Sequence, residues 1–153
     1  CENILLDINL NAKIADFGFS RLNSEGIEMD LGSEFHRAPE ICIKDFPFDG
    51  EKADVFALAI ILFAMQMKSF PTERMYNVID TPKYKAFASG RVQDFWPASP
   101  QVSVLFKDLF QGMFRQDPSS RATLDQITSH PWLNGDLPSK DEITAEIARL
   151  YAI

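Results

Sequence analysis

The run from Val55 to Met65 most constrains how this chain can fold, because it contains eleven apolar residues in succession. A membrane-spanning helix needs about 20 such residues, so the run is too short to cross a bilayer. A stretch this apolar has to be covered by other parts of the chain. We therefore predict a helix from Ala53 to Met67 that is buried on all sides, with Asp54 capping its first turn.

Three further segments have a helical pattern. Residues 101–118 are amphipathic, and a Pro at position 118 would end that helix. Its predicted apolar face has the i, i+3, i+4 spacing and comprises Val102, Leu105, Phe106, Leu109, Phe110, Met113 and Phe114. A short helix is predicted before Pro131, and another after Ser139, which has the capping-box spacing to Glu142. The apolar stripe of this last helix comprises Ile143, Ile147, Leu150 and Tyr151.

The beginning of the chain has a strand pattern instead. Two short apolar runs, Ile4–Leu6 and Lys13–Ala15, flank a turn that is rich in Asp and Asn. The following residues, 19–37, are irregular and polar, which is typical of a functional or a disordered loop. The sequence therefore predicts a mainly α fold with a short β-hairpin. The alternation of strands and helices that a doubly wound sheet needs is absent.

Composition narrows the class of protein. The 153 residues suit one domain, and the net charge of -7 argues against a nucleic-acid partner, since no basic stripe is present. We expect no membrane association. Two cysteines are too few for a disulfide framework, and no signal-peptide pattern is visible, so we expect a cytoplasmic protein.

Two polar residues of the predicted hairpin point to a metal site. Asp16 opens an Asp-Phe-Gly triplet after the second strand, and Asn3 lies thirteen residues earlier, next to the first strand. A strand pair would hold both side chains adjacent, and Mg²⁺ takes such oxygen ligands. The alternatives are a turn-capping Asp and a strand-end Asn. We expect Gly18 to supply a positive φ where the strand turns into the loop.

The order of motifs resembles the C-terminal lobe of a eukaryotic protein kinase. "CEN", "DFG" and, after the long loop, "APE" (Ala38-Pro39-Glu40) follow one another at family-like spacing. The resemblance covers residues 1–133 and implies a kinase C-terminal lobe with its N-terminal lobe absent. Residues 134–153 would form a C-terminal helical extension, either regulatory or packed on the lobe. The chain is most similar to the calcium/calmodulin-dependent kinase group, of Ser/Thr type.

The resemblance implies roles for individual residues. Asp16 would bind the Mg²⁺ that bridges the ATP phosphates and Asn3 the second Mg²⁺. Leu5 and Ala15 would line the adenine pocket, with membership of the core as the alternative. Glu2 and Ser33 would contact the protein substrate, with exposed polar positions as the alternative. The structural motif residues would be Phe17, Gly18, Ala38, Pro39, Glu40, Asp54 and Arg121.

Two of these motif residues have implied partners. Arg121 would form an ion pair with Glu40, and Asp54 would hold the backbone of the catalytic loop. The catalytic Asp itself would lie before Cys1, together with the N-terminal lobe. The resemblance therefore implies a fragment of a Ser/Thr kinase that transfers the γ-phosphate of ATP to protein Ser/Thr, inactive on its own.

A non-catalytic, pseudokinase-like interaction module is the alternative function. His36 and Arg37 stand where the family commonly has Tyr and an apolar residue, and Met29 occupies the usual activating phosphosite. His36 would be either a pH-sensitive contact or a substituted packing position. The chain could also bind a regulatory partner, which the sequence does not identify.

Overall fold

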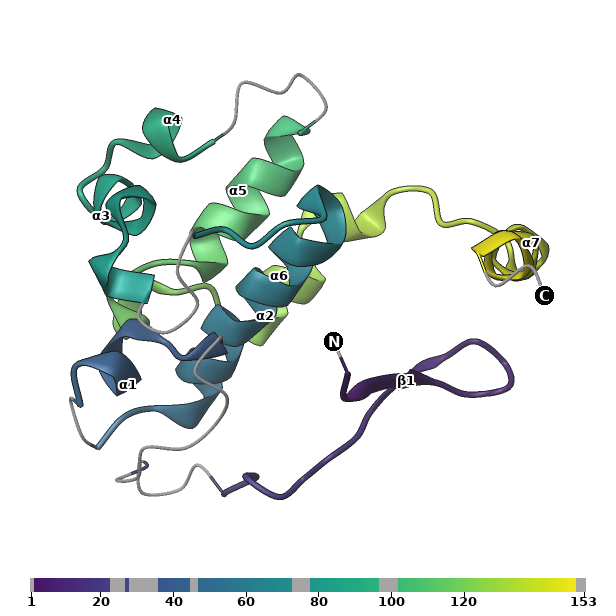
Figure 1. The fold of residues 1–153 in the computed structure, drawn as a ribbon, viewed down its shortest axis with the longest axis horizontal. Helices are drawn as coiled ribbons and strands as arrows, with labels where there is room; N and C mark the ends of the chain where they lie inside the picture. Colours follow the sequence, from purple (N-terminus) through teal and green to yellow (C-terminus); the bar gives the residue numbers. More distant parts are fainter. Residues whose placement is uncertain are drawn as a thin grey trace. The chain divides into compact units, whose positions relative to one another are not determined.

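The computed structural model describes residues 2–22, 27, 36–44, 47–72, 78–96 and 102–150. Its residues form two compact units, Cys1–Gly18 with Asn134–Ile153, and Phe19–Leu133. The described part is mainly helical and has one two-stranded sheet, as the sequence predicted (Figure 1). Its elements are β1 (Ile4–Leu6), β2 (Ala12–Ile14), α1 (Pro39–Cys42), α2 (Gly50–Met67), η2 (Val78–Asp80), α3 (Pro82–Ala88), α4 (Val92–Phe95), α5 (Val104–Met113), η3 (Pro118–Ser120), α6 (Leu124–Thr128), η4 (Pro131–Asn134) and α7 (Lys140–Leu150), where η denotes a 3₁₀ helix.

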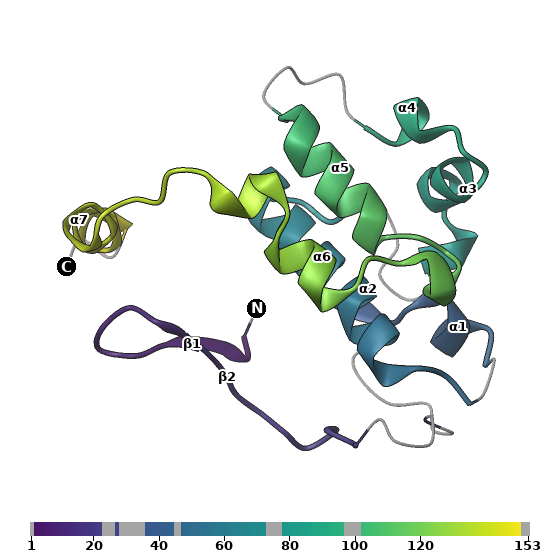
Figure 2. The same ribbon diagram turned by 180° about the vertical axis from the view of Figure 1, so that it is seen from behind.

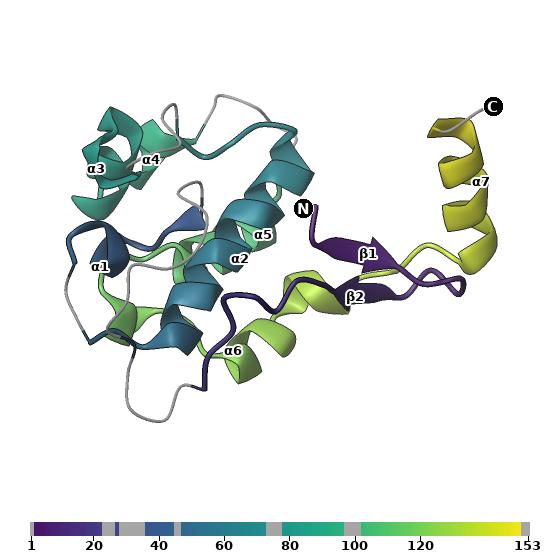
Figure 3. The same cartoon turned by 60° about the horizontal axis from the view of Figure 1, so that its bottom comes forward.

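The hairpin is antiparallel, with Ile4 opposite Ile14 (Figure 3). Its turn is closed by the Asp7 carboxylate, which accepts the backbone N–H groups of Asn9 at 2.8 Å and Asn11 at 2.9 Å. These bonds hold the pKa of Asp7 below its ordinary value, because they favour the charged carboxylate. The second strand begins one residue earlier than predicted.

The central helix α2 begins three residues before the predicted start. Its N-cap is Asp49, whose carboxylate accepts the backbone N–H of Glu51 at 2.9 Å and of Lys52 at 3.3 Å. The prediction that Asp54 caps this helix was therefore wrong. Asp54 lies inside the helix, where the backbone N–H groups already have helical partners.

The prediction that α2 is buried on all sides was also wrong. Leu58 and Met65 are exposed, while one broad face is covered by α5 and the segments around it. That buried face comprises Ala53, Val55, Phe56, Ala59, Ile60 and Phe63. Among the helices that the structure describes, none combines the length and apolarity needed to cross a bilayer.

Helix α5 supplies the other half of the core. It begins at the predicted amphipathic segment, where the Ser103 hydroxyl caps the backbone N–H of Phe106 at 3.1 Å. The predicted apolar face was one position too wide, because Leu105 is 46% exposed. At the α-helical rotation of about 100° per residue, the centre of the buried face lies about 90° around the helix from Leu105, so Leu105 stands at the edge of that face.

Stacked aromatic rings join α2 to α5 and to the α3–α4 segment. Phe114 lies 4.6 Å from Phe56 and 4.7 Å from Phe110, measured between ring centroids, and Phe63 lies 5.1 Å from Phe110. Phe95 of α4 also stacks on Phe110, at 5.5 Å. Figure 2 shows α2 and α5 side by side, with α3 and α4 beside them. Such ring pairs add stability beyond the burial of their apolar surface.

The last two α-helices begin at capping boxes. In α6, the Thr123 hydroxyl and the Gln126 side chain exchange hydrogen bonds with the backbone N–H groups. In α7, the Glu142 carboxylate accepts the Ser139 N–H at 2.8 Å and the Ser139 hydroxyl caps the Glu142 N–H at 3.3 Å. The predicted capping box of the final helix is confirmed.

We predict that Phe110→Ala lowers the free energy of unfolding by about 3–5 kcal/mol, because the side chain is completely buried and its removal leaves a cavity among the rings. Chemical denaturation followed by circular dichroism measures the change. Leu105→Ala in the same helix is the matched control and should lower stability much less. Equal losses in both variants would contradict the assigned core.

Candidate functional site

The structure brings Asn3 and Asp16 together at the open end of the hairpin. The backbone N–H of Ala15 donates to the Asn3 carbonyl at 2.8 Å, which continues the strand pairing beyond β1 and β2. The Asn3 side-chain amide then lies 3.3 Å from Asp16 Oδ2. Both side chains are exposed, so a carboxylate and a carboxamide face the same solvent-accessible space.

The backbone of Asp16 is strained. Its φ is 62°, in the left-handed region that few non-glycine residues adopt. A short polar side chain can compensate with a local hydrogen bond, and here Asp16 Oδ1 accepts the N–H of Gly18 at 3.0 Å. Strained residues of this kind gather at functional sites.

The prediction that Gly18 has a positive φ was wrong. The positive φ belongs to Asp16, and Gly90 is the glycine with a positive φ among the described residues. A Cβ on Gly18 would lie 3.1 Å from Asp16 Oδ1. A side chain there would crowd that oxygen, so glycine serves the close approach between the carboxylate and the backbone.

The donor set at the hairpin fits Mg²⁺ with ATP. Mg²⁺ is usually held by one or two protein oxygens together with substrate phosphates and water. Asp16 offers a carboxylate oxygen and the Asn3 carboxamide carries a second oxygen, although here the Asn3 Nδ2–H is the group that faces Asp16 Oδ2. The described residues contain no cluster of three or more His, Cys, Asp or Glu side chains that could hold a metal by themselves. The bound cation would neutralise negative charge on the triphosphate.

The other hairpin residues singled out in the sequence lie at the surface. Leu5 and Phe17 are exposed, and Ala15 is half-buried. The alternative that Leu5 belongs to the core is therefore wrong. Glu2 is also exposed. Ser33, like Met29, lies outside the described residues.

In the helical unit, Glu40 and Arg121 form a buried, bidentate ion pair. The two guanidinium nitrogens of Arg121 each lie 2.6 Å from one carboxylate oxygen of Glu40. The Arg121 side chain is fully buried and that of Glu40 is 5% exposed. Bidentate geometry of this kind gives the strongest pairing between Arg and a carboxylate.

The remaining N–H groups of Arg121 are also satisfied. The guanidinium donates to the carbonyls of Arg115 at 2.8 Å, Lys52 at 2.9 Å and Gln116 at 3.1 Å, and it lies 5.0 Å from the ring centre of Phe56. Lys52 in turn donates from Nζ to the Arg121 carbonyl at 3.1 Å. A buried ion pair is stable only with such complete hydrogen bonding.

The "APE" segment is shaped by this pair. Ala38 is fully buried and extended, and Pro39 occupies the first position of α1, where its fixed φ suits a helix start and its missing N–H has no consequence. Sequence reasoning missed the carbonyls of Lys52, Arg115 and Gln116, which hold Arg121 in place. The Asp-Pro pair at 117–118 was a cap signal that we interpreted only as a helix end.

His36 and Asp54 have contrasting surroundings. Burial lowers the pKa of the half-buried His36 imidazole, which keeps the ring neutral near pH 7 and favours a packing position over a pH-sensitive contact. Asp54 is exposed as a residue, although partial burial of its carboxyl group raises the pKa. The Asp54 carboxylate makes no hydrogen bond or ion pair with the residues that the structure describes.

Comparison with known proteins follows the same motifs. The sequence model of the protein kinase domain family matches residues 1–133 of this chain. The chain belongs to the protein kinase family. It is also similar to the serine/threonine-protein kinase chk1 of Schizosaccharomyces pombe, with 36% identity over 143 residues. That alignment covers 90% of this chain and 28% of the relative, so the chain spans less than a third of that kinase.

We predict that Arg121→Met lowers the free energy of unfolding by about 3–5 kcal/mol, because it leaves the Glu40 carboxylate buried without its partner. Adding Glu40→Leu should recover part of this loss. Arg149→Met is the matched control, since Arg149 forms an equally short pair with Glu146 at the surface, where solvent screens the charges, so its loss should lower stability far less. Denaturant titration measures all four proteins, and equal effects at Arg121 and Arg149 would contradict the prediction.

We also predict an acid-sensitive cap at η3. Hydrogen bonds from the Ser119 hydroxyl and N–H hold the pKa of Asp117 below its ordinary value. This cap therefore stabilises the fold above the pKa of the unfolded chain, and the contribution is lost as pH falls through the folded value. Ser119→Ala should raise the Asp117 pKa, as measured by NMR titration of its carboxyl carbon. Ser120→Ala should leave it unchanged, because Ser120 donates to the Asp117 backbone carbonyl.

Proposed function

We propose that this chain is the C-terminal lobe of a Ser/Thr protein kinase, and that its parent transfers the γ-phosphate of ATP to protein Ser/Thr. The observation that carries the proposal is the contact between the Asn3 and Asp16 side chains, together with the left-handed backbone of Asp16. The similarity to a serine/threonine-protein kinase supports the Ser/Thr class. The cofactor would be Mg²⁺ with ATP as co-substrate, and the partner a protein substrate.

The proposed division of labour follows from the chain's residues. Asp16 and Asn3 would hold Mg²⁺, Leu5 and Ala15 would face the adenine, and Glu2 and Ser33 would contact the substrate. Glu40 and Arg121 would fix the end of the substrate-side loop. The chain would resemble the calcium/calmodulin-dependent kinase group, and the parent kinase would act in the cytoplasm. The catalytic Asp would be contributed by sequence before Cys1, so the 153 residues alone would not transfer phosphate.

The test uses the parent kinase, with the upstream sequence included, and a peptide substrate. Asp16→Asn should lower phosphate transfer by several orders of magnitude, because positioning and electrostatic stabilisation supply most of phosphoryl-transfer catalysis. Asp7→Asn is the matched control in the same hairpin. An Asn at position 7 can still accept the turn hydrogen bonds, so activity should be retained.

The chain by itself gives a second test. Purified without upstream sequence, it should show no Mg-ATP-dependent phosphorylation above background. Detectable transfer that Asp16→Asn abolishes would overturn the proposed need for an upstream base.

A non-catalytic interaction module is the second candidate. His36 and Arg37 in place of the family's common residues favour it. A parent that binds Mg-ATP and a partner protein but transfers no phosphate would support this module over the kinase.

A further inference from the structure

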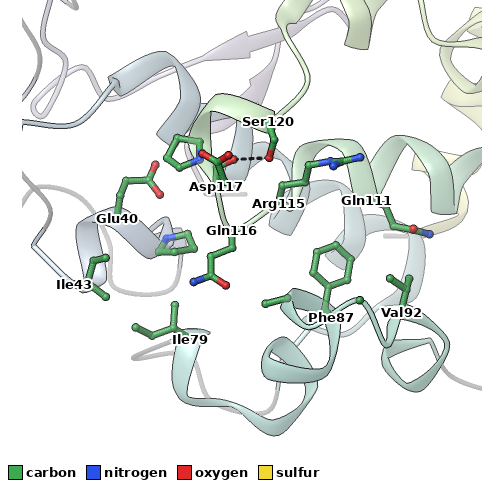
Figure 4. Close-up of a pocket in the computed structure, with 14 residues that line it drawn as sticks. Glu40, Ile43, Ile79, Phe87, Val92, Gln111, Arg115, Gln116, Asp117 and Ser120 are labelled. Carbon is green, nitrogen blue, oxygen red and sulfur yellow. Dashed lines mark hydrogen bonds between the residues drawn. The ribbon is translucent and has the colours of Figure 1, made fainter.

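A groove in the unit Phe19–Leu133 has no role in the proposed metal and nucleotide site. It has a volume of about 650 Å³ and lies between α1, α3 and the carboxyl end of α5 (Figure 4). Ile43 and Ile79 line one end of the groove, and Phe87 and Val92 line the other. Cavities of this size with a mainly apolar lining and a few polar groups are typical binding sites.

The charges that line this groove cancel one another. Both oxygens of the Glu40 carboxylate lie 2.6 Å from the Arg121 guanidinium, so this carboxylate offers no unpaired charge to an occupant. The Asp117 carboxylate accepts hydrogen bonds from the Ser119 N–H and hydroxyl, and its negative charge is matched by the positive charge of Arg115 on the same groove. An occupant without net charge therefore complements the groove.

Three polar side chains at the groove have hydrogen-bonding groups to spare. The side chains of Gln111, Arg115 and Gln116 form no hydrogen bond or ion pair with the part of the chain that the structure describes. Figure 4 shows Gln116 between the two apolar ends of the groove, with Arg115 and Gln111 along one wall. A carboxamide can bind both the N–H and the C=O of a peptide group, and a guanidinium can bind the C=O.

These free groups favour an extended occupant over a helical one. A helix pairs its backbone N–H and C=O groups internally, apart from those at its ends. An extended segment leaves these groups unpaired, and they need partners when the segment is buried in a groove. The carboxamides and the guanidinium supply such partners.

We propose that this groove docks an extended, uncharged segment of the protein substrate, with two apolar side chains on one face. The inference rests on the proposed function, because it identifies the occupant with the substrate of the kinase. Residues i and i+2 of an extended chain lie on the same face. One apolar side chain would fill the Ile43 end and the other the Phe87 end, and the Gln116 carboxamide would bind the peptide groups between them.

The place of the groove in the chain favours the substrate as its occupant. The lining includes Pro39 and Glu40 of α1, which directly follow the end of the substrate-side loop. A segment of the substrate bound at that loop would therefore continue into the groove. Ile43, at the end of α1, is 61% exposed although it is large and apolar, and docking would remove this side chain from water.

The first test measures binding to the full chain by fluorescence anisotropy. The probe is a fluorescein-labelled, amidated peptide of sequence Gly-Ser-Leu-Gln-Leu-Ser-Gly. Ile43→Ser and Gln116→Ala should each weaken its binding about fivefold, since each removes one contact of the docked segment. Peptides with Glu or Lys in place of the central Gln should bind more weakly, because the groove has no net charge to compensate either one.

A matched control separates docking from general effects. Val104→Ser also replaces an exposed β-branched residue by Ser, at a position that is 81% exposed and lies outside the groove. It should leave the affinity for the peptide unchanged. Circular dichroism and thermal unfolding check that each variant remains folded.

The second test uses the parent kinase and two substrates that share one acceptor sequence. Only the longer substrate carries the Leu-Gln-Leu segment, joined through a flexible Gly-Ser linker. Ile43→Ser should raise the KM of the longer substrate about fivefold, and should leave its kcat and the kinetics of the shorter substrate unchanged.

The two tests distinguish a failure of docking from a failure of the proposed function. A parent that phosphorylates both substrates with the same KM would overturn docking and leave the kinase function intact. A parent that phosphorylates neither, while the peptide still binds in the groove, would overturn the kinase function and the identification of the occupant as its substrate.

Three results of the binding test would also overturn the proposal. The first is the absence of peptide binding, or binding that neither Ile43→Ser nor Gln116→Ala weakens. The second is tighter binding of a peptide with Glu or Lys at its centre, which would assign the groove to a charged partner. The third is self-association of the chain that Ile43→Ser abolishes, without peptide binding, which would make a second copy the occupant.

Discussion

The Glu40–Arg121 ion pair connects two parts of the chain that are 81 residues apart, and the helical unit depends on it. Burial of two charges is unfavourable unless every donor finds an acceptor. Arg121 meets this condition by reaching three backbone carbonyls as well as Glu40. One guanidinium thus fixes the start of α1, the first turn of α2 and the turn before η3 relative to one another.

The same ion pair explains why Ala38–Glu40, the segment that ends the long loop, has a defined conformation. α1 is only four residues long and has no side-chain cap, so it lacks the local bonds that stabilise longer helices. Its position comes from Pro39, from the buried Ala38 and from the carboxylate of Glu40. A substrate-side loop that ends at this segment would be anchored to the core through a side chain rather than through backbone pairing.

The hairpin site has a different physical basis, because its geometry is local. Asn3 and Asp16 lie close together because the strands are paired. The left-handed backbone of Asp16 is stabilised by the hydrogen bond that its carboxylate accepts from the Gly18 N–H. Rigid pairing of the strands is what places these two polar side chains next to each other. The site therefore does not need the ion pair of the helical unit in order to form.

An uninterrupted apolar run predicted α2, and apolar stripes at helical spacing predicted α5 and α7, since such surfaces have to be covered. The helix boundaries depend on the capping residues instead. Asp49 and Ser103 decide where α2 and α5 begin, and such caps compete with other polar residues nearby, as Asp54 did. Leu105 was misplaced because a sequence pattern cannot tell which edge of a stripe the neighbouring helix covers.

The sequence by itself determined the order and identity of the chemical groups: Asn before the first strand, Asp-Phe-Gly after the second, and Ala-Pro-Glu with its distant Arg. These are properties of residue type and spacing, which need no coordinates. Tertiary structure alone decided that Lys52, Phe56 and two further carbonyls surround Arg121, and that Gly18 serves close approach while Asp16 carries the positive φ. The reason is physical: a buried charge and a strained backbone are stabilised by whichever groups packing brings near, and spacing along the chain does not encode those distances.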